Sequence, residues 1–303
     1  MIETRLLQQF IAVAEELHFH RAAIRLHMAQ PPLSQAINRL EEKLGFVLLV
    51  RDKREVRLTA AGHAFLQGAY QTLQALNQGT EYAREVSRGL AGKLTVTALS
   101  IVGYGSLLNT FRQFKTTFPK VQLVIKEMPS LHQAQAIAAG EADIAFMRTL
   151  PIASSFLTSR LLLTEDILLA LPIDHPKGVD KDVDLRHFAE DDFVFTPQAL
   201  GSGYHQQLIA LCEAAGFYPR VAQEAAQLHT LIGLVAGGFG VALVPETVAQ
   251  SVRHDSVMYR KIRPLSPTID TRLGLYATWD MRNDSPLLAR FTSMLDFSET
   301  SAS

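Results

Sequence analysis

Residues 29–44 read AQPPLSQAINRLEEKL, and this stretch decides how the N-terminal part of the chain folds. Pro31 and Pro32 stand where a helix can begin, because the first turn of a helix has no internal use for their missing N–H groups. Apolar residues then recur at steps of four, three and four, a spacing that predicts one apolar stripe on a helix. The stripe is Leu33, Ile37, Leu40 and Leu44, and the opposite face carries Ser34, Gln35, Asn38 and Arg39.

The segments around this helix predict a winged helix-turn-helix. Amphipathic helices are expected over Leu6–Leu17 and Phe19–Leu26, and a polar helix just after a shorter one is what a major-groove reader needs. Gly45 is expected to end the helix, and two short strands, residues 46–50 and 56–58, follow it. The basic tip between these strands, residues 51–54, is either a solvated loop or a wing that contacts phosphates or a minor groove.

A long helix is predicted from Thr59 to Ser87. Its apolar residues form a short heptad-like seam, which indicates a dimerisation helix roughly 40 Å long; packing of the seam on its own domain is the alternative. The seam consists of Leu66, Ala69, Leu73 and Leu76, continued by Ala83 and Val86.

From Lys93 onward, strands and helices alternate in the βαβαβ rhythm of a parallel sheet. A second region of the same class follows, and a late strand returns to the first lobe, so we expect two α/β lobes with a cleft between them. The expected strands are residues 94–99, 121–126, 143–147, 167–171, 193–196, 221–224, 241–244 and 273–278. The expected helices are residues 104–118, 131–139, 204–215, 227–236 and 287–295.

Composition indicates a soluble protein of 303 residues with room for two or more domains. No apolar run reaches the ~18 residues of a membrane span, and no signal-peptide pattern opens the chain, so we expect a cytoplasmic protein. The single cysteine, Cys212, excludes an intrachain disulfide and has the setting of a buried hydrophobe rather than a reactive thiol. Residues 1–92 carry a net charge of +2 and the remainder −3, so any affinity for DNA must come from where charge is placed.

Two other functions can be weighed against DNA binding. Gly103-Tyr104-Gly105 after a strand invites a dinucleotide-binding enzyme, but Leu108 stands where the fingerprint needs a third glycine. The histidines do not have metal-ligand spacing on a helix. A solute-binding module alone would leave the first 60 residues without a purpose.

The order of these parts resembles a LysR-type transcriptional regulator over essentially the whole chain, with a looser likeness to the subgroup that governs aromatic-compound catabolism. The N-terminal matches are Phe10, Ala14, Phe19, Arg21-Ala22-Ala23, Leu26, Gln30-Pro31-Pro32-Leu33-Ser34, Ile37, Leu40-Glu41, Leu44-Gly45, Leu48-Leu49, Arg51, Arg54, Leu58-Thr59 and Gly62. The C-terminal matches are Phe118-Pro119, Gly140, Asp143-Ile144-Ala145, His175-Pro176, Gly238, Gly240-Val241 and Val244-Pro245. The chain departs from the family at His18-Phe19-His20, where Ser-Phe-Thr is frequent; the lost hydroxyls would remove a side-chain cap of the second helix and one phosphate contact.

The resemblance implies an α/β multidomain fold: a winged helix-turn-helix DNA-binding domain at residues 1–59, a linker and dimerisation helix at 60–89, and an effector-binding domain at 90–303. That last domain would be two-lobed and similar to periplasmic binding proteins, with lobe I at about 93–163 plus 266–303 and lobe II at about 164–265. It implies double-stranded DNA with an inverted repeat, a homodimer or homotetramer, RNA polymerase and a small-molecule effector as partners. It implies no enzyme activity, no metal and no cofactor beyond a co-inducer.

Side-chain chemistry selects candidate DNA contacts on the reading helix and wing. Gln35 and Asn38 suit adenine, while Pro32 can touch a thymine methyl. Arg39 and Lys43 are open between phosphate contacts and surface ion pairs with Glu42 or Glu16. The predicted DNA-binding residues are Gln30, Pro31, Pro32, Ser34, Gln35, Asn38, Arg39, Arg51, Lys53 and Arg54.

The expected cleft is lined by strand ends and helix N-termini, which favour anions, so the sequence predicts a small organic acid or aromatic carboxylate as effector. Arg148 would pair either with that acid or with a surface carboxylate. Ser100 and Ser130 would at least cap helices. The predicted effector-binding residues are Ser100, Ile101, Val102, Ser130, Arg148, Thr196, Pro197 and Tyr204.

Overall fold

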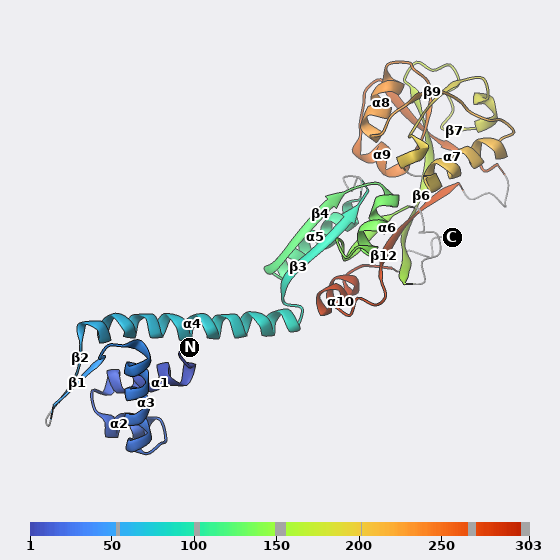
Figure 1. The fold of residues 1–303 in the computed structure, drawn as a ribbon. Helices are drawn as coiled ribbons and strands as arrows, with labels where there is room; N and C mark the ends of the chain where they lie inside the picture. Colours follow the sequence, from blue (N-terminus) through green and yellow to red (C-terminus); the bar gives the residue numbers. More distant parts are fainter. Residues whose placement is uncertain (53–54, 100–103, 149–155, 201, 266–270, 298–303) are drawn as a thin grey trace. The chain divides into compact units, whose positions relative to one another are not determined.

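The computed structural model describes residues 1–297 except 53–54, 100–103, 149–155, 201 and 266–270. The chain forms two compact units, residues 1–85 and 86–303, and each is described by itself (Figure 1). None of the helices in the described ranges combines the length and apolar character needed to cross a bilayer.

The first unit has the order of elements that the sequence predicts. Three short helices pack around one apolar core, a two-stranded antiparallel hairpin follows, and a long helix closes the unit. The elements are α1 (Thr4–Glu16), α2 (Phe19–Arg25), α3 (Gln30–Leu44), β1 (Leu49–Arg51), β2 (Val56–Leu58) and α4 (Ala60–Ser87).

Local signals set the ends of these helices. The two prolines lie in the first turn of α3, and Gly45 ends it in the left-handed conformation with φ 76°. The expected loss of a side-chain cap on α2 is wrong. His18 replaces the usual hydroxyl, because its ring Nδ1 accepts a hydrogen bond from the backbone N–H of His20 at 3.2 Å.

Helix α4 divides its predicted seam between two environments. Ala69 is buried, and Leu66 and Leu73 pack against the core of the first unit, as the alternative interpretation required. Farther along, Leu76 is 52% exposed, and Tyr82 and Val86 also lie open to solvent. The second half of the helix therefore carries most of its exposed apolar side chains.

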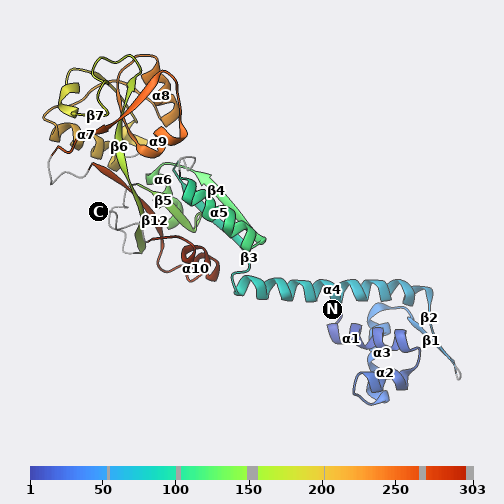
Figure 2. The same cartoon turned by 180° about the vertical axis from the view of Figure 1, so that it is seen from behind.

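The second unit contains two lobes built on one bent sheet (Figures 1 and 2). In the first lobe, three parallel strands in the order β4-β3-β5 confirm the predicted βαβαβ rhythm, and the helices pack an aromatic-rich core against them. These elements are β3 (Ala91–Ala98), α5 (Gly105–Thr117), β4 (Lys120–Glu127), α6 (Ser130–Ala138), β5 (Ile144–Met147) and α10 (Pro286–Ser293).

In the second lobe, helices cover both sides of a mixed set of strands. The elements are β7 (Asp182–Val183), η1 (Leu185–Phe188), β8 (Asp192–Phe195), η2 (Gln198–Leu200), α7 (Ser202–Ala214), β9 (Arg220–Glu224), α8 (Leu228–Ala236), β10 (Ala242–Pro245), α9 (Glu246–Ser251) and β11 (Val257–Ile262). Strand β8 pairs with β9 and touches the start of β10 through Phe193 and Val241.

Two long strands connect the lobes: β6 (Leu157–Pro172) and β12 (Arg272–Asp280). The first part of β6, to Asp166, pairs with β12, and its last part, from Ile167, pairs with β10 and β11. The sequence predicted only residues 167–171 of this strand. The part before it was missed because it mixes charged and apolar residues without a clean alternation.

Gly62 is a position where the fold of the first unit leaves no room for a side chain. The hydroxyl of Thr59 accepts the backbone N–H of Gly62 at 2.8 Å and donates to the carbonyl of Val47 at 2.9 Å, so the start of α4 lies tightly against the hairpin. A Cβ on Gly62 would come within 2.1 Å of the Leu48 carbonyl oxygen, whereas Gly68 has open space.

We therefore expect Gly62→Ala to lower the stability of the first unit by about 1–3 kcal/mol. Gly68→Ala should raise it by about 0.5–1 kcal/mol, because alanine restricts the unfolded chain. Scanning calorimetry of the full chain measures both changes. Fluorescence of Trp279, which lies in β12 and is the chain's single tryptophan, should show the second unit unaffected. Equal effects of the two substitutions would contradict this role of Gly62.

Candidate functional site

The polar face of α3 is largely open to solvent. Most of the predicted DNA contacts on this helix are exposed, and Ser34 is half-buried. The side chains of Gln35, Asn38 and Arg39 make no hydrogen bond or ion pair with any described residue. The exposed predicted residues are Gln30, Pro31, Pro32, Gln35, Asn38 and Arg39.

Below this face, the apolar stripe fixes the helix in place. Leu33, Ile37 and Leu40 are completely buried in the core of the first unit. Lys43 forms its ion pair with Glu3 at 3.3 Å, which corrects the expected partners Glu42 and Glu16. The helix therefore presents its polar groups from a rigid support.

The carboxylate of Glu41 joins α3 to the hairpin. One oxygen accepts the backbone N–H groups of Leu48 at 2.8 Å and Leu49 at 3.0 Å. The other oxygen lies 3.2 Å from Nη2 of Arg51. The resemblance named Glu41, but no sequence signal indicated that it orders the start of β1.

Arg51 lies between the helix and the hairpin. Besides Glu41, its guanidinium reaches the hydroxyl of Ser34 at 3.4 Å and stands 4.8 Å from the centre of the Phe19 ring. Lys53 and Arg54, the other predicted wing residues, lie outside the described residues.

The second unit contains a cavity of about 450 Å³ that both lobes line. This volume suits a small organic molecule. Four of the predicted effector-binding residues line it, while Pro197 does not, and Ser100, Ile101 and Val102 lie outside the described residues. The lining residues are Leu99, Glu127, Met128, Pro129, Ser130, Arg148, Thr196, Tyr204, Ala226, Gln227 and Leu228.

Two helices begin at this cavity, one from each lobe. Helix α6 begins at Ser130 and α8 at Leu228, and neither has a side chain capping its first N–H groups. Ser130 is only 7% exposed, and its hydroxyl makes no hydrogen bond with a described residue. Free N–H groups and helix dipoles at this cavity favour a negatively charged ligand.

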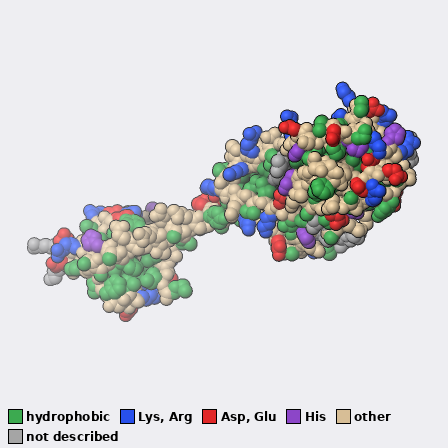
Figure 3. Space-filling view, turned by 90° about the horizontal axis from the view of Figure 1, so that it is seen from above, with side chains coloured by type: hydrophobic (Ala, Val, Ile, Leu, Met, Phe, Trp, Pro, Cys, Tyr) green, Lys and Arg blue, Asp and Glu red, His purple; other side chains and the backbone are tan. Residues whose placement is uncertain are grey.

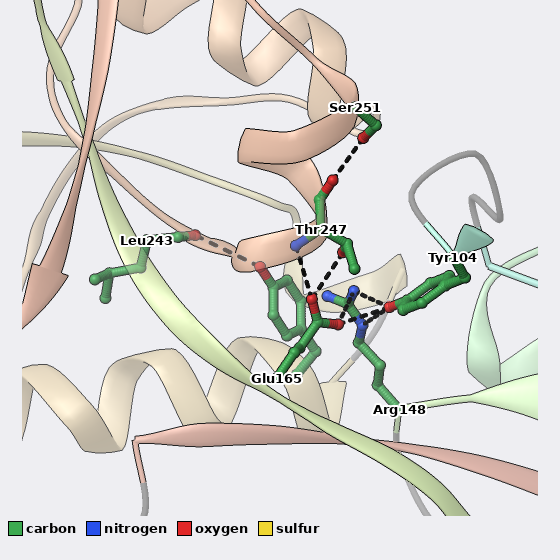
Figure 4. Close-up of polar contacts among 7 residues, drawn as sticks. Tyr104, Arg148, Glu165, Leu243, Thr247 and Ser251 are labelled. Atoms are coloured by element: carbon green, nitrogen blue, oxygen red, sulfur yellow. Dashed lines mark hydrogen bonds and ion pairs between the residues drawn. The ribbon is translucent and has the colours of Figure 1, made fainter. Parts of the chain in front are cut away.

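A buried network lies behind the cavity (Figure 4). The carboxylate of Glu165 accepts hydrogen bonds from Tyr104 at 2.7 Å and from Nη2 of Arg148 at 2.9 Å. Its other oxygen accepts the backbone N–H and the hydroxyl of Thr247 at 3.0 and 2.7 Å. Arg148 and Tyr104 belong to the first lobe and Thr247 lies in the first turn of α9 in the second, so Glu165 on β6 connects the lobes.

This network shows which acidic residue pairs with Arg148. Its partner is the buried acid Glu165 rather than a surface carboxylate, and the two side chains are 7% and 6% exposed. The guanidinium also donates to the Tyr104 hydroxyl through Nε and Nη2 and faces the Tyr204 ring at 5.4 Å. Nη1 makes no hydrogen bond with a described residue.

Burial sets the protonation states around Arg148. It raises the pKa values of the Tyr104 and Tyr204 phenols, so both remain neutral at physiological pH. Burial alone would lower the pKa of the Arg148 guanidinium, but its electrostatic and hydrogen-bonding interactions with Tyr104 and Glu165 outweigh that effect, so its pKa is raised. Burial also raises the pKa of the Cys212 thiol to about 12, so this cysteine stays protonated and is not a reactive thiolate.

Several residues of the cavity and its support were not predicted. Gln227 and Leu228 carried the same signal as Ser130, because they stand at the start of an expected helix. Glu165 and Thr247 carried no such signal. An acidic residue in a strand, such as Glu165, is ordinarily predicted to face solvent.

An exposed polar helix in a winged helix-turn-helix and a cavity between two lobes define the class of ligand-regulated DNA-binding proteins. Comparisons with known families give the family itself. Residues 4–63 match the family model described as a bacterial regulatory helix-turn-helix protein of the LysR family, and residues 87–297 match the LysR substrate binding domain. The chain belongs to the LysR family of DNA-binding transcriptional regulators, which are not enzymes.

Individual relatives agree with this assignment. The chain is 34% identical over 303 residues to the regulator AlsR of Bacillus subtilis (strain 168), covering 99% of this chain and 97% of AlsR. It is 36% identical over 269 residues to ShiR of Corynebacterium glutamicum (strain R), covering 86% and 91%. The solved structure of full-length CbnR with its target DNA has a TM-score of 0.79 at 28% identity, covering 97% and 98% of the two chains.

Glu165 offers a direct test of the buried network. Glu165→Gln should lower the stability of the second unit by about 3–5 kcal/mol, because it leaves the Arg148 charge buried without its counter-ion. Urea unfolding followed by Trp279 fluorescence measures the change. The double variant Arg148→Met/Glu165→Leu should be less destabilised than the single variant, since it removes both charges. A single variant as stable as the wild type would show that the pair is not needed.

Proposed function

We propose that α3 reads operator DNA through Gln30, Pro31, Pro32, Ser34, Gln35, Asn38 and Arg39, and that Arg51, Lys53 and Arg54 of the wing also contact the DNA. The observation that carries this proposal is the exposed polar face of α3, whose amides and guanidinium make no hydrogen bond or ion pair with a described residue. Amide side chains of this kind can donate and accept at once, as an adenine edge requires. Arg51 is engaged with Glu41, so we assign it chiefly to holding the wing in place.

The distribution of charge is consistent with DNA recognition by specifically positioned side chains rather than by a large net positive charge. On the face shown in Figure 3, acidic and basic side chains of the second unit are interspersed rather than gathered by sign. A chain with a net charge of −1 gains little from general attraction to phosphates. Specific contacts from α3 must therefore supply most of the discrimination between operator DNA and other DNA sequences.

Substitution of Gln35 tests this assignment. Gln35→Ala should weaken binding to the specific operator by about 1–3 kcal/mol and leave nonspecific binding nearly unchanged. Titrations of operator and scrambled DNA at one salt concentration measure the difference. Gln67→Ala, an exposed glutamine on α4, is the matched control and should bind like the wild type. Equal affinities and footprints for the Gln35 variant and the wild type would refute α3 as the reader.

We further propose that the chain divides into a DNA-binding domain at 1–59, a dimerisation helix at 60–89 and an effector-binding domain at 90–303. The exposed apolar residues Leu76, Tyr82 and Val86 support dimerisation through α4. Dimers or tetramers would bind inverted half-sites in the cytoplasm and act on RNA polymerase. Sedimentation velocity that finds only monomers at micromolar concentration would contradict this part.

We propose that the cavity of the second unit binds a small organic acid, including aromatic carboxylates. Support comes from groups that have no partner among the described residues: the hydroxyl of Ser130, Nη1 of Arg148, and the first N–H groups of α6 and α8. Buried polar groups without partners are rare and destabilising, and a carboxylate could accept hydrogen bonds from those at Ser130 and Arg148. The apolar lining, including Leu99, Met128 and Leu228, would contact the rest of the ligand.

Ser130 tests the acid site without disturbing the ion pair behind it. Ser130→Ala should weaken the binding of benzoate or butanoate about tenfold, because a hydrogen bond to a charged group is lost. Calorimetric titration of the full chain measures this effect, with Ser106→Ala, an exposed serine on α5, as the control. Binding of the uncharged benzamide as tightly as benzoate would contradict an acid site.

A further inference from the structure

The lining of the cavity carries charges of both signs. Glu127 and Arg148 are the charged side chains among its described lining residues. Arg148 is already neutralised, because Glu165 lies 2.9 Å from Nη2 and both side chains are buried. The charge of Glu127 has no such match, since its carboxylate makes no hydrogen bond or ion pair with a described residue.

Glu127 lies close to the acid-binding end of the cavity along the chain. It is the last residue of β4, and Ser130 begins α6 three residues later. Three residues of extended chain span about 10 Å at most, so both residues can contact one small ligand. The backbone N–H of Met128 donates to the Ala98 carbonyl at 3.0 Å, which fixes the segment between them to β3.

The two ends of this segment favour opposite chemistry. The N-terminus of α6 and the Ser130 hydroxyl favour a carboxylate. The Glu127 carboxylate repels a second carboxylate at the distance of a small ligand and accepts a hydrogen bond from a hydroxyl or an ammonium group. A dicarboxylate of the same size would satisfy one end and be opposed at the other.

We propose that the effector is a small acid carrying a hydrogen-bond donor, a hydroxyl or protonated amine, and that Glu127 selects it over dicarboxylates. This inference rests on the proposed acid site and names the class of acid that the site takes. Glu127 acts here as a specificity-determining residue, while Ser130 and the helix N-termini provide the affinity for the shared carboxylate.

Calorimetric titration of the full chain with matched compounds tests the inference. The aromatic series is benzoate, 3-hydroxybenzoate, 3-(aminomethyl)benzoate and isophthalate, and the aliphatic series is butanoate, 4-aminobutanoate and pentanedioate. We expect the tightest compound of at least one series to carry the hydroxyl or amine. The dicarboxylate of that series should bind at least fivefold more weakly.

The variant Glu127→Gln should reverse this order. The dicarboxylate should bind more tightly than to the wild type and the amine more weakly, while benzoate and butanoate should change less than twofold. Glu141→Gln, an exposed glutamate beyond the end of α6, is the matched control and should keep the wild-type order.

The outcomes separate this inference from the proposed function. Dicarboxylates that bind as tightly as the donor-bearing acids in both wild type and Glu127→Gln would overturn the role of Glu127 and leave the acid site standing. If no acid of either series binds the wild type, the acid site itself is wrong and the selectivity falls with it.

Discussion

The carboxylate of Glu165 holds the two lobes of the second unit to one another. It accepts two hydrogen bonds from the first lobe, from Tyr104 and Arg148, and two from Thr247 at the start of α9. A carboxylate taken out of water loses several kcal/mol of hydration, which only a full set of donors and a counter-ion can offset. Glu165 has both, so the position of one side chain fixes the cavity wall at Arg148 and the first turn of α9.

The first unit uses the same device at its own working surface. Glu41 receives two backbone N–H groups from the start of the hairpin and the guanidinium of Arg51. Charged acceptors form stronger hydrogen bonds than neutral ones, so a carboxylate can order a chain segment that has too few residues for a core. In both units an acid pairs with an arginine and also accepts at least one backbone N–H group.

The sequence predicted the parts of the fold that periodicity and end signals determine. The stripe of α3, its prolines and Gly45 placed that helix within one residue, and the alternating segments placed the parallel strands of the first lobe. The first half of β6 was missed, because pairing with β12 rather than a local pattern makes it a strand. Ser130, Arg148, Thr196 and Tyr204, which line the cavity, were predicted because strand ends and helix starts mark a cleft. Glu165 was not predicted. It is buried by contacts with residues that lie far from it in the sequence, such as Tyr104 and Thr247.

A ligand can shift the arrangement of two lobes only as far as it binds one arrangement more tightly than another. The cavity meets this condition by construction, because Ser130 and Arg148 belong to one lobe and Thr196 and Gln227 to the other. Any movement of one lobe against the other changes which of these groups reach the ligand at once. The Glu165 network opposes such movement with hydrogen bonds to both lobes, and a ligand in the proposed site would add its binding free energy to the same balance. A tenfold difference in affinity between two arrangements corresponds to about 1.4 kcal/mol, which is comparable to one of the hydrogen bonds that Glu165 accepts. Glu165 accepts four such hydrogen bonds, so a ligand that breaks the whole network must favour one arrangement by considerably more than tenfold.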